Sequence, residues 1–307
     1  MARVLTTDRG DAGRRLDLVL RRHLTELSGA SRSRVQRWIA EGRVTVNGRT
    51  VSRPAARVAL GDAIAVADAG LTAKRRVEPE DIPLSILYED DELVVLDKPA
   101  GLVVHPAYRH LSGTLLNGLL WHARDWPRPR RPSIVGRLDR LTSGLVLVAK
   151  SRAVHSALQR ILPLPQSLKL YLAVVHGRVS PIRGEIDLGL ARQAGDRRRV
   201  AVSQMGSPSR TRYVLLSSGR GLSLVRCQLI TGRLHQIRVH LAARGWPIVG
   251  DPVYGRSDPA LAFPRQALHA WRVAFDHPAT GRRVEVEAPL PADIQALLSA
   301  AHLRVPS

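Results

Sequence analysis

The sequence predicts an α+β protein with a small basic N-terminal module, a linker, and a larger domain built on a mixed, mainly antiparallel sheet. Runs typical of strands alternate irregularly with short helical stretches, unlike the regular strand–helix order of a doubly wound sheet. A polar and charged segment also divides the chain near residues 68–81, and a length of 307 residues is typical of two units.

The first predicted unit, residues 13–67, begins with two helices and continues as strands. Apolar residues at helical spacing start the first helix at Leu16 and end it near His23–Leu24. Ser31 is a suitable N-cap for the second helix, and Gly42 ends it. Short β-rich runs then predict three strands, at 44–49, from Val51 onward and at 61–66.

The composition predicts a polyanionic partner. The chain has 47 Lys and Arg against 26 Asp and Glu, which gives a formal net charge of +21. Nucleic acid is the usual partner of so basic a protein, and an anionic membrane is the alternative. The membrane is the weaker prediction, because no apolar run reaches the roughly 18 residues of a spanning helix. The N-terminus lacks the apolar core of a signal peptide, and the single Cys227 fits a reducing cytoplasm.

Several arginines gather on the second predicted helix and just after it. Their clustering favours contacts with nucleic-acid phosphates, and a merely solvated basic face is the alternative interpretation. These residues are Arg32, Arg34, Arg37 and Arg43.

The second predicted domain, residues 82–300, follows a linker at 68–81. Two β-rich runs around an acidic turn predict a hairpin within 86–106, and a basic loop is expected at 192–199. The other predicted elements are helices at 114–122 and 153–162 and strands at 170–175, 213–216, 223–230 and 284–288.

One carboxylate, Asp139, stands between Arg137 and Arg140 in the segment 136–144. A Thr-Ser-Gly turn and an apolar run typical of a buried strand follow it. Neighbouring guanidinium groups keep such a carboxylate ionised, and an ionised carboxylate at the mouth of a strand can act as a nucleophile. For an isolated motif of this kind, a turn aspartate with surface arginines is the simpler interpretation.

Two further segments combine apolar and polar residues. Tyr171 lies in a run typical of a strand, where an ordinary half-buried aromatic is the simplest interpretation. Arg238 lies among apolar residues in 229–240, and a buried Arg requires an acidic partner. His235 and His240 suggest a metal site, but no third ligand stands at a recognisable spacing, so polar packing is expected for both.

The order of these segments resembles that of RluA-type pseudouridine synthases over about residues 14–291. The matching strings are Lys-Pro-x-Gly at 98–101, Arg-Leu-Asp at 137–139, Lys-x-Tyr at 169–171 and His-Gln-Ile-Arg at 235–238. The N-terminal unit resembles the alpha-L RNA-binding module found in a small-subunit ribosomal protein. The combination is most similar to the branch that acts on large-subunit ribosomal RNA.

This resemblance implies the pseudouridine synthase fold and an isomerase that converts specific uridines in RNA without a cofactor. It implies that Asp139 reacts, that Arg238 pairs with it, and that Tyr171 stacks on the target base and takes part in proton transfer. It further implies that Arg137 helps to displace the base and fill its place.

Two positions depart from the family pattern. Gly136 stands where the family usually has His, which affects how Arg137 is held. The stretch before Tyr171 is usually charged, whereas 162–167 carries no charge here.

Three other functions are weighed against a synthase of ribosomal RNA: a non-catalytic RNA-binding assembly factor, a synthase acting on tRNA, and a glycoside hydrolase. The complete set of Asp139, Tyr171 and Arg238 argues against the assembly factor, since binding alone needs no such carboxylate. A hydrolase normally needs two facing carboxylates, and these motifs supply one. A cytoplasmic monomer is expected.

Overall fold

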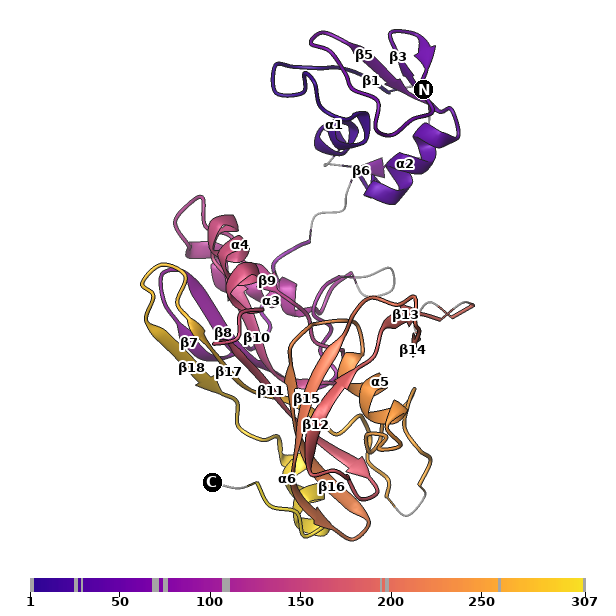
Figure 1. The fold of residues 1–307 in the computed structure, drawn as a ribbon. Coiled ribbons are helices and arrows are strands. Elements are labelled where there is room, and N and C mark those ends of the chain that lie inside the picture. The colour runs from indigo at the N-terminus through magenta and orange to yellow at the C-terminus, as the bar shows by residue number, and fades with distance from the viewer. Residues whose placement is uncertain are drawn as a thin grey trace. The chain divides into compact units, whose positions relative to one another are not determined.

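The chain divides into two compact units in a computed structural model, Met1–Arg76 and Val77–Ser307 (Figure 1). The structure describes residues 3–24, 27–28, 30–67, 72–73, 77–106, 111–193, 195–196, 199–258 and 261–305. No helix within these ranges is long and apolar enough to cross a membrane. Each unit has apolar side chains buried in a core of its own, as expected of a domain.

Two helices pack against a four-stranded sheet in the N-terminal unit. α1 (Leu16–His23) and α2 (Arg32–Ala40) lie where the apolar spacing predicts them. The Ser31 hydroxyl accepts the backbone N–H of Arg34 at 3.4 Å, which caps α2 as predicted. The strands follow the order β1 (Arg3–Thr6), β5 (Ala63–Val66), β3 (Val44–Val46) and β4 (Arg49–Thr50).

Two strands of this unit differ from the prediction. β1 lies before residue 13, where the predicted unit begins. The prediction missed it because its four largely exposed residues show no alternation of apolar and polar side chains. β4 begins at Arg49 instead of Val51. Asn47 and Gly48 both have positive φ and close a two-residue hairpin, so the returning strand starts directly after them.

The predicted linker at 68–81 is only partly a linker. Within it, β6 (Thr72–Ala73) pairs with β2 (Leu27–Ser28) and so belongs to the N-terminal unit. Its last residues, 77–81, belong to the second unit, where the Asn117 amide donates to the carbonyl oxygen of Glu78 at 2.8 Å. The rest of the linker, residues 68–71 and 74–76, lies outside the described residues.

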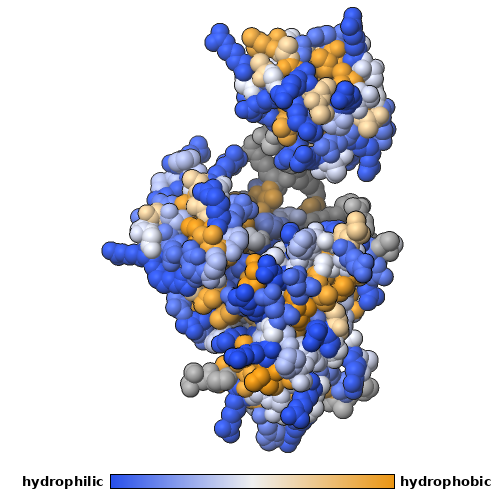
Figure 2. All heavy atoms as spheres, viewed as in Figure 1, coloured by the Kyte–Doolittle hydropathy of each residue, from blue (hydrophilic) through white to orange (hydrophobic). Residues whose placement is uncertain are grey.

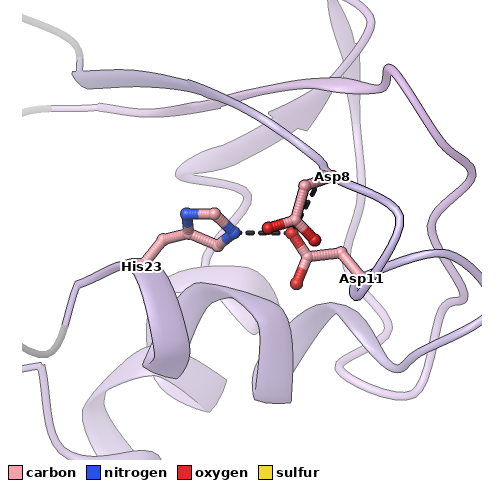
Figure 3. A group of neighbouring side chains, drawn as sticks. All are labelled: Asp8, Asp11 and His23. Atoms are coloured by element: carbon pink, nitrogen blue, oxygen red, sulfur yellow. Dashed lines mark hydrogen bonds and ion pairs between the residues drawn. The ribbon is translucent and has the colours of Figure 1, made fainter.

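A cluster of charged side chains joins the segment before α1 to that helix (Figure 3). The buried Asp11 carboxylate accepts hydrogen bonds from Arg22 at 2.7 Å and from His23 at 2.6 Å, and Arg22 also pairs with Asp8 at 2.9 Å. Burial opposes ionisation of Asp11, but these partners lower its pKa to about 2. Because a guanidinium occupies the carboxylate oxygens, we interpret Asp8, Asp11 and His23 as a structural tie rather than as a metal site.

A ten-stranded sheet forms the frame of the second unit (Figure 1). Eight strands follow the order β12 (Arg183–Asp187), β15 (Arg210–Gly219), β16 (Leu222–Leu229), β11 (Leu168–His176), β17 (Leu268–Asp276), β10 (Ser143–Ala149), β8 (Leu93–Lys98) and β7 (Ser85–Glu89). β18 (Arg283–Glu287) also pairs with β17, and β9 (Ser133–Val135) with β10. The single parallel pair within the described sheet is β10–β17, so the predicted mixed, mainly antiparallel sheet is confirmed.

The helices divide between the two halves of this sheet (Figure 1). α3 (Leu115–His122) and α4 (Arg152–Ile161) bury apolar side chains against β8 and β10, close to their predicted positions, and a short 3₁₀ turn, Ala123–Asp125, follows α3. α5 (Gln236–Ala243) and α6 (Ala292–Ala300), neither of which was predicted, pack on the half that contains β11 and β16. A small hairpin of β13 (Leu190–Arg192) and β14 (Val200–Val202) lies beside α5.

The two halves of the sheet meet where β10 and β17 touch. Their parallel pairing involves only Ser143 with His269 and Gly144 with Ala270. A Cβ atom on Gly144 would lie 2.2 Å from the carbonyl oxygen of Ala270, so this close approach requires glycine. Tyr171, on the neighbouring β11, packs against both apolar cores and marks the boundary between them.

Candidate active site

Asp139 lies in the loop 136–142, between β9 and the buried strand β10. The carbonyl oxygen of the next residue, Arg140, accepts two hydrogen bonds, from Lys98 Nζ at 3.1 Å and from the Gly101 N–H at 2.8 Å. The N–H of Thr142 donates to the carbonyl oxygen of Asp139 itself at 3.1 Å. The backbone on the C-terminal side of Asp139 is therefore fixed by several hydrogen bonds.

Lys98 is among the largest fully buried side chains of the described residues, and the sequence predicts no role for it beyond the Lys-Pro-x-Gly string. Its ammonium group donates to the carbonyl oxygens of Pro99 at 2.7 Å and of Leu102 and Arg140 at 3.1 Å. Burial, with the nearby charge of Arg265, lowers the pKa of Lys98 to about 8.

Arg238, in the first turn of α5, links Asp139 to a second carboxylate. Its Nη1 donates to Oδ2 of Asp139 at 2.8 Å. Its Nε and Nη2 donate to the two oxygens of Asp251, at 2.6 and 2.8 Å, in a bidentate pair. Burial alone would lower the pKa of Arg238, but the hydrogen bonds and charges of Asp251 and Asp139 raise it.

Asp251 is the acidic partner that a buried Arg238 requires, and no sequence pattern pointed to it. Its side chain is fully buried. One of its oxygens also accepts the backbone N–H groups of Val253 at 2.9 Å and of Tyr254 at 3.0 Å. Burial would raise the pKa of Asp251, but the contacts with Arg238 and with these N–H groups lower it. Asp251 is therefore a fixed negative charge behind Arg238.

The two histidines of the 229–240 segment have different surroundings. His240 is fully buried, and both of its ring nitrogens have partners, Thr211 Oγ1 at 2.9 Å and the Leu188 carbonyl oxygen at 3.2 Å, so the predicted polar packing is confirmed. His235 is only partly explained by packing. Its Nδ1 lies 2.9 Å from the Tyr254 hydroxyl, but its Nε2 faces Asp139 Oδ2 at 3.8 Å.

Tyr171 and Asp139 line the same cavity, which has a volume of about 360 Å³. The cavity extends over β10 and β17, and Leu162 and Pro163, from the uncharged stretch 162–167, form part of its wall. Burial raises the pKa of Tyr171, and the negative charge of Asp139 adds to the effect, so the phenol keeps its proton. A volume of about 300–1,000 Å³ is usual for small-molecule sites, and this cavity falls within that range.

The structure thus brings together three segments that are far apart in the sequence. Asp139 and Arg238 are in direct contact, and Tyr171 joins them at a narrower recess of about 50 Å³. Arg137 lines the same recess and is exposed to solvent. Gly136 has φ of 85°, a conformation that suits glycine.

Residues 92–243 match the family model described as RNA pseudouridylate synthase, and residues 14–64 match the S4 domain model. The chain is 42% identical over 303 residues to ribosomal large subunit pseudouridine synthase D of Nitrosomonas europaea, covering 96% of this chain and 87% of that protein. It is 43% identical over 299 residues to the protein of the same name from Pseudomonas aeruginosa, covering 94% and 92%. The chain belongs to the RNA pseudouridylate synthase family.

The predicted family, enzyme class and fold are therefore confirmed: the protein is a pseudouridine synthase, an isomerase that acts on RNA. Solved structures agree. The human RNA pseudouridylate synthase domain containing 1 protein superimposes with a TM-score of 0.55 at 26% identity, over 77% of this chain and all of that one. The corresponding human domain containing 4 protein has a TM-score of 0.60 at 24% identity, over 73% and 95%, and supports the fold.

The S4 domain of this pseudouridine synthase carries the predicted arginine cluster. The four residues are exposed on α2 or just beyond it: Arg32, Arg34, Arg37 and Arg43. Arg34 lies over the ring of Trp38, 5.6 Å from its centroid, and Arg43 pairs with Glu41 at 2.9 Å. Figure 2 shows hydrophilic side chains over much of the visible face of this unit. Their contacts with RNA stay a prediction.

Proposed function

We propose that this synthase isomerises uridines in large-subunit ribosomal RNA, and that Asp139 is the carboxylate that reacts. The names of its relatives and the S4 domain support the choice of RNA. One observation carries the proposal about Asp139. Its carboxylate contacts the buried Arg238 at 2.8 Å and borders a cavity that Tyr171 also lines. A carboxylate held in this way is oriented before substrate arrives.

The proposed chemistry gives Asp139, Arg238 and Tyr171 one role each. The bond between N1 of uracil and C1′ of ribose breaks, the base turns, and C5 bonds to C1′ while the proton on C5 is transferred to N1. The Asp139 carboxylate attacks the nucleoside or abstracts a sugar proton, and Arg238 holds it in place. Tyr171 offers its ring face for stacking and its protonated hydroxyl for hydrogen bonding. Because isomerisation adds no electrons or groups, we propose that no cofactor is needed.

The target base has to leave its stack in the folded RNA before it enters the cavity. Extruding a nucleotide costs a few kcal/mol. We propose that Arg137, exposed at the edge of the recess, helps to displace the base, and that phosphate contacts along the basic surface offset the cost. The S4 arginines would supply part of those contacts.

Asp139→Asn tests the assignment of the reacting group. The substitution keeps the size and one oxygen but removes the negative charge, so we expect pseudouridine formation to disappear while RNA affinity stays within about twofold. Wild type and variant would be incubated separately with unmodified large-subunit ribosomal RNA and with unmodified tRNA, followed by digestion to nucleosides. Turnover by the variant would refute the role of Asp139. Wild-type activity on tRNA alone would refute the proposed substrate.

A further inference from the structure

His235 begins α5 in an unusual backbone conformation. Its φ is 54°, in the left-handed region, whereas residues in this position are usually extended. Few residues other than glycine adopt this conformation, although His does so more often than most, and such residues gather at functional sites. The imidazole is mostly buried and presents one nitrogen to Tyr254 and the other to Asp139. The strained backbone therefore aims the ring at the recess.

The contacts of Tyr254 favour one tautomer of His235 over the other. The Tyr254 oxygen accepts the N–H of Val200 at 2.8 Å, so its own hydroxyl hydrogen needs an acceptor. Among the residues that the structure describes, the acceptor in reach is Nδ1 of His235, at 2.9 Å. Burial and the charge of Arg238 lower the pKa of His235, although Asp139 acts in the opposite direction. The lowered pKa favours the neutral ring. A neutral ring that accepts at Nδ1 has its hydrogen on Nε2.

The Nε2–H group lies beside the oxygen that Arg238 already holds. Nε2 is 3.8 Å from Oδ2 of Asp139, and Arg238 donates to that same atom at 2.8 Å. Oδ1 accepts no hydrogen bond from any described side chain, and the Asp139 side chain is partly exposed. Hydrogen bonds at active sites are often long before substrate binds. A shift of about 1 Å would bring Nε2 within hydrogen-bond distance of Oδ2.

We propose that His235 is a positioning residue whose Nε2–H closes on Oδ2 of Asp139 when RNA binds, leaving Oδ1 as the oxygen presented to the nucleoside. The proposal rests on the proposed role of Asp139. Tyr254 is part of the same arrangement. Its hydroxyl orients the imidazole, and its ring lies 5.0 Å from the guanidinium carbon of Arg238. Two donors on Oδ2 would fix the carboxylate more firmly than Arg238 alone.

Two substitutions of His235 separate positioning from packing. Asn suits the left-handed backbone, but its amide ends short of Oδ2, whereas the longer Gln places an N–H group near the position of Nε2. We expect His235→Asn to lower the single-turnover rate about 10- to 100-fold with unchanged RNA affinity. His235→Gln should stay within about tenfold of wild type. A purely structural role predicts the reverse order, because Asn fits the backbone better.

Matched controls accompany these variants. His302→Asn makes the same change at another position of positive φ, 55°, at an exposed site near the C-terminus, and should leave the rate unchanged. Tyr254→Phe keeps the ring against Arg238 but removes the hydroxyl, so the rate should fall without a change in affinity. In a crystal structure of the wild type with its product RNA, Nε2 and Oδ2 should lie about 3 Å apart, with Oδ1 nearer to the ribose.

The inference is overturned if His235→Asn matches wild type, if His235→Gln is no better than His235→Asn, or if Oδ2 faces the nucleoside in the product complex. Asp139→Asn belongs in the same assay. If that variant turns over, the proposed function itself fails. If it is inactive while His235→Asn is fully active, the proposed function stands and only this inference fails.

Discussion

Arg238 donates hydrogen bonds to two carboxylates, so a change at Arg238 affects both of them. Three hydrogen bonds from one guanidinium join the partly solvated Asp139 to the fully buried Asp251. Only a planar group with donors on both sides can do this. Holding the reacting carboxylate is thus coupled to the stability of the domain, because the same side chain neutralises a buried charge.

Arg238→Ala should therefore abolish activity and also destabilise the second unit. It would leave Asp251 buried without a cation, and breaking a buried ion pair from one side costs about 3–5 kcal/mol. Arg238→Lys keeps the charge but not the bidentate pair, so we expect an intermediate loss of both properties. Activity on ribosomal RNA and chemical unfolding would be measured for both variants.

Asp139→Asn is the matched comparison for the stability measurement. It removes the other carboxylate of Arg238 but leaves the buried pair with Asp251 intact, so its unfolding free energy should lie within about 1 kcal/mol of wild type. If Arg238→Ala is as stable as wild type, the domain does not need Arg238 to neutralise the buried charge of Asp251.

The requirement for an acidic partner was predictable from the sequence, but the identity of the partner was not. A buried Arg demands a carboxylate, and the resemblance to the family pointed to Asp139. Asp251 lies 13 residues beyond Arg238, after the end of α5, and its distance from the guanidinium depends on how the chain turns through 244–250. Burial of Lys98 was equally hidden, because its partners are backbone carbonyl groups that no side-chain pattern reveals.

At the scale of elements, the sequence predicted the helices that have one apolar and one polar face. It missed α5, whose residues are mostly buried, and β1, whose residues are mostly exposed. The helices α1, α2, α3 and α4 show polar and apolar faces or clear caps, and they lie where expected. In α5, six consecutive residues are buried, 236–241, so it has no polar face in that stretch to reveal a helical period. The edge strand β1 is too short and too exposed to show a pattern.

β10 and β17 both line the cavity and pair through two residues each, and Gly144→Ala tests this contact. The added Cβ would lie 2.2 Å from the carbonyl oxygen of Ala270 and would also force a side chain into φ of 108°. Gly281→Ala introduces strain alone, since φ is 68° and no atom lies within 4 Å of the new Cβ. We expect Gly281→Ala to lower Tm by about 2–4 °C, and Gly144→Ala to lower it by more than twice as much.

Thermal unfolding of both purified variants, followed by circular dichroism, provides the measurement. The difference between them isolates the steric contact from the backbone strain. Equal shifts in Tm would mean that β10 can move away from β17 at little cost, and the short parallel pair would then be a weak element of the fold.

At the scale of the whole molecule, the basic chain folds as two compact units. The residues proposed to react all lie in the second unit, whereas the arginine cluster lies in the S4 domain, with the boundary between Arg76 and Val77. The sequence indicated this division through its polar segment and its charge. The exact boundary depended on the pairing of β6 with β2, a contact between short segments that are far apart in the chain.

Deleting residues 1–76 should therefore leave a folded second unit that binds ribosomal RNA less tightly. Each phosphate that the protein no longer neutralises should reduce the magnitude of the slope of log affinity against log salt by about 0.7–0.9. Because α2 and its flank expose four arginines, we expect the deletion to free several phosphates and to make the slope clearly shallower. Affinity for one ribosomal RNA fragment would be measured for both forms across a range of salt concentrations.

A second variant decides whether the arginines themselves are responsible. The full-length chain with Gln at positions 32, 34, 37 and 43 has four fewer positive charges, and we expect it to keep the S4 fold because all four side chains are exposed; circular dichroism would check that it does. If these residues contact phosphate, its slope should approach that of the truncated protein. If the four-Gln variant has the wild-type slope while the truncated protein has a shallower one, other parts of the S4 domain make the RNA contacts. An unchanged slope in both forms would mean that the cluster is only a solvated surface and that the second unit binds the RNA alone.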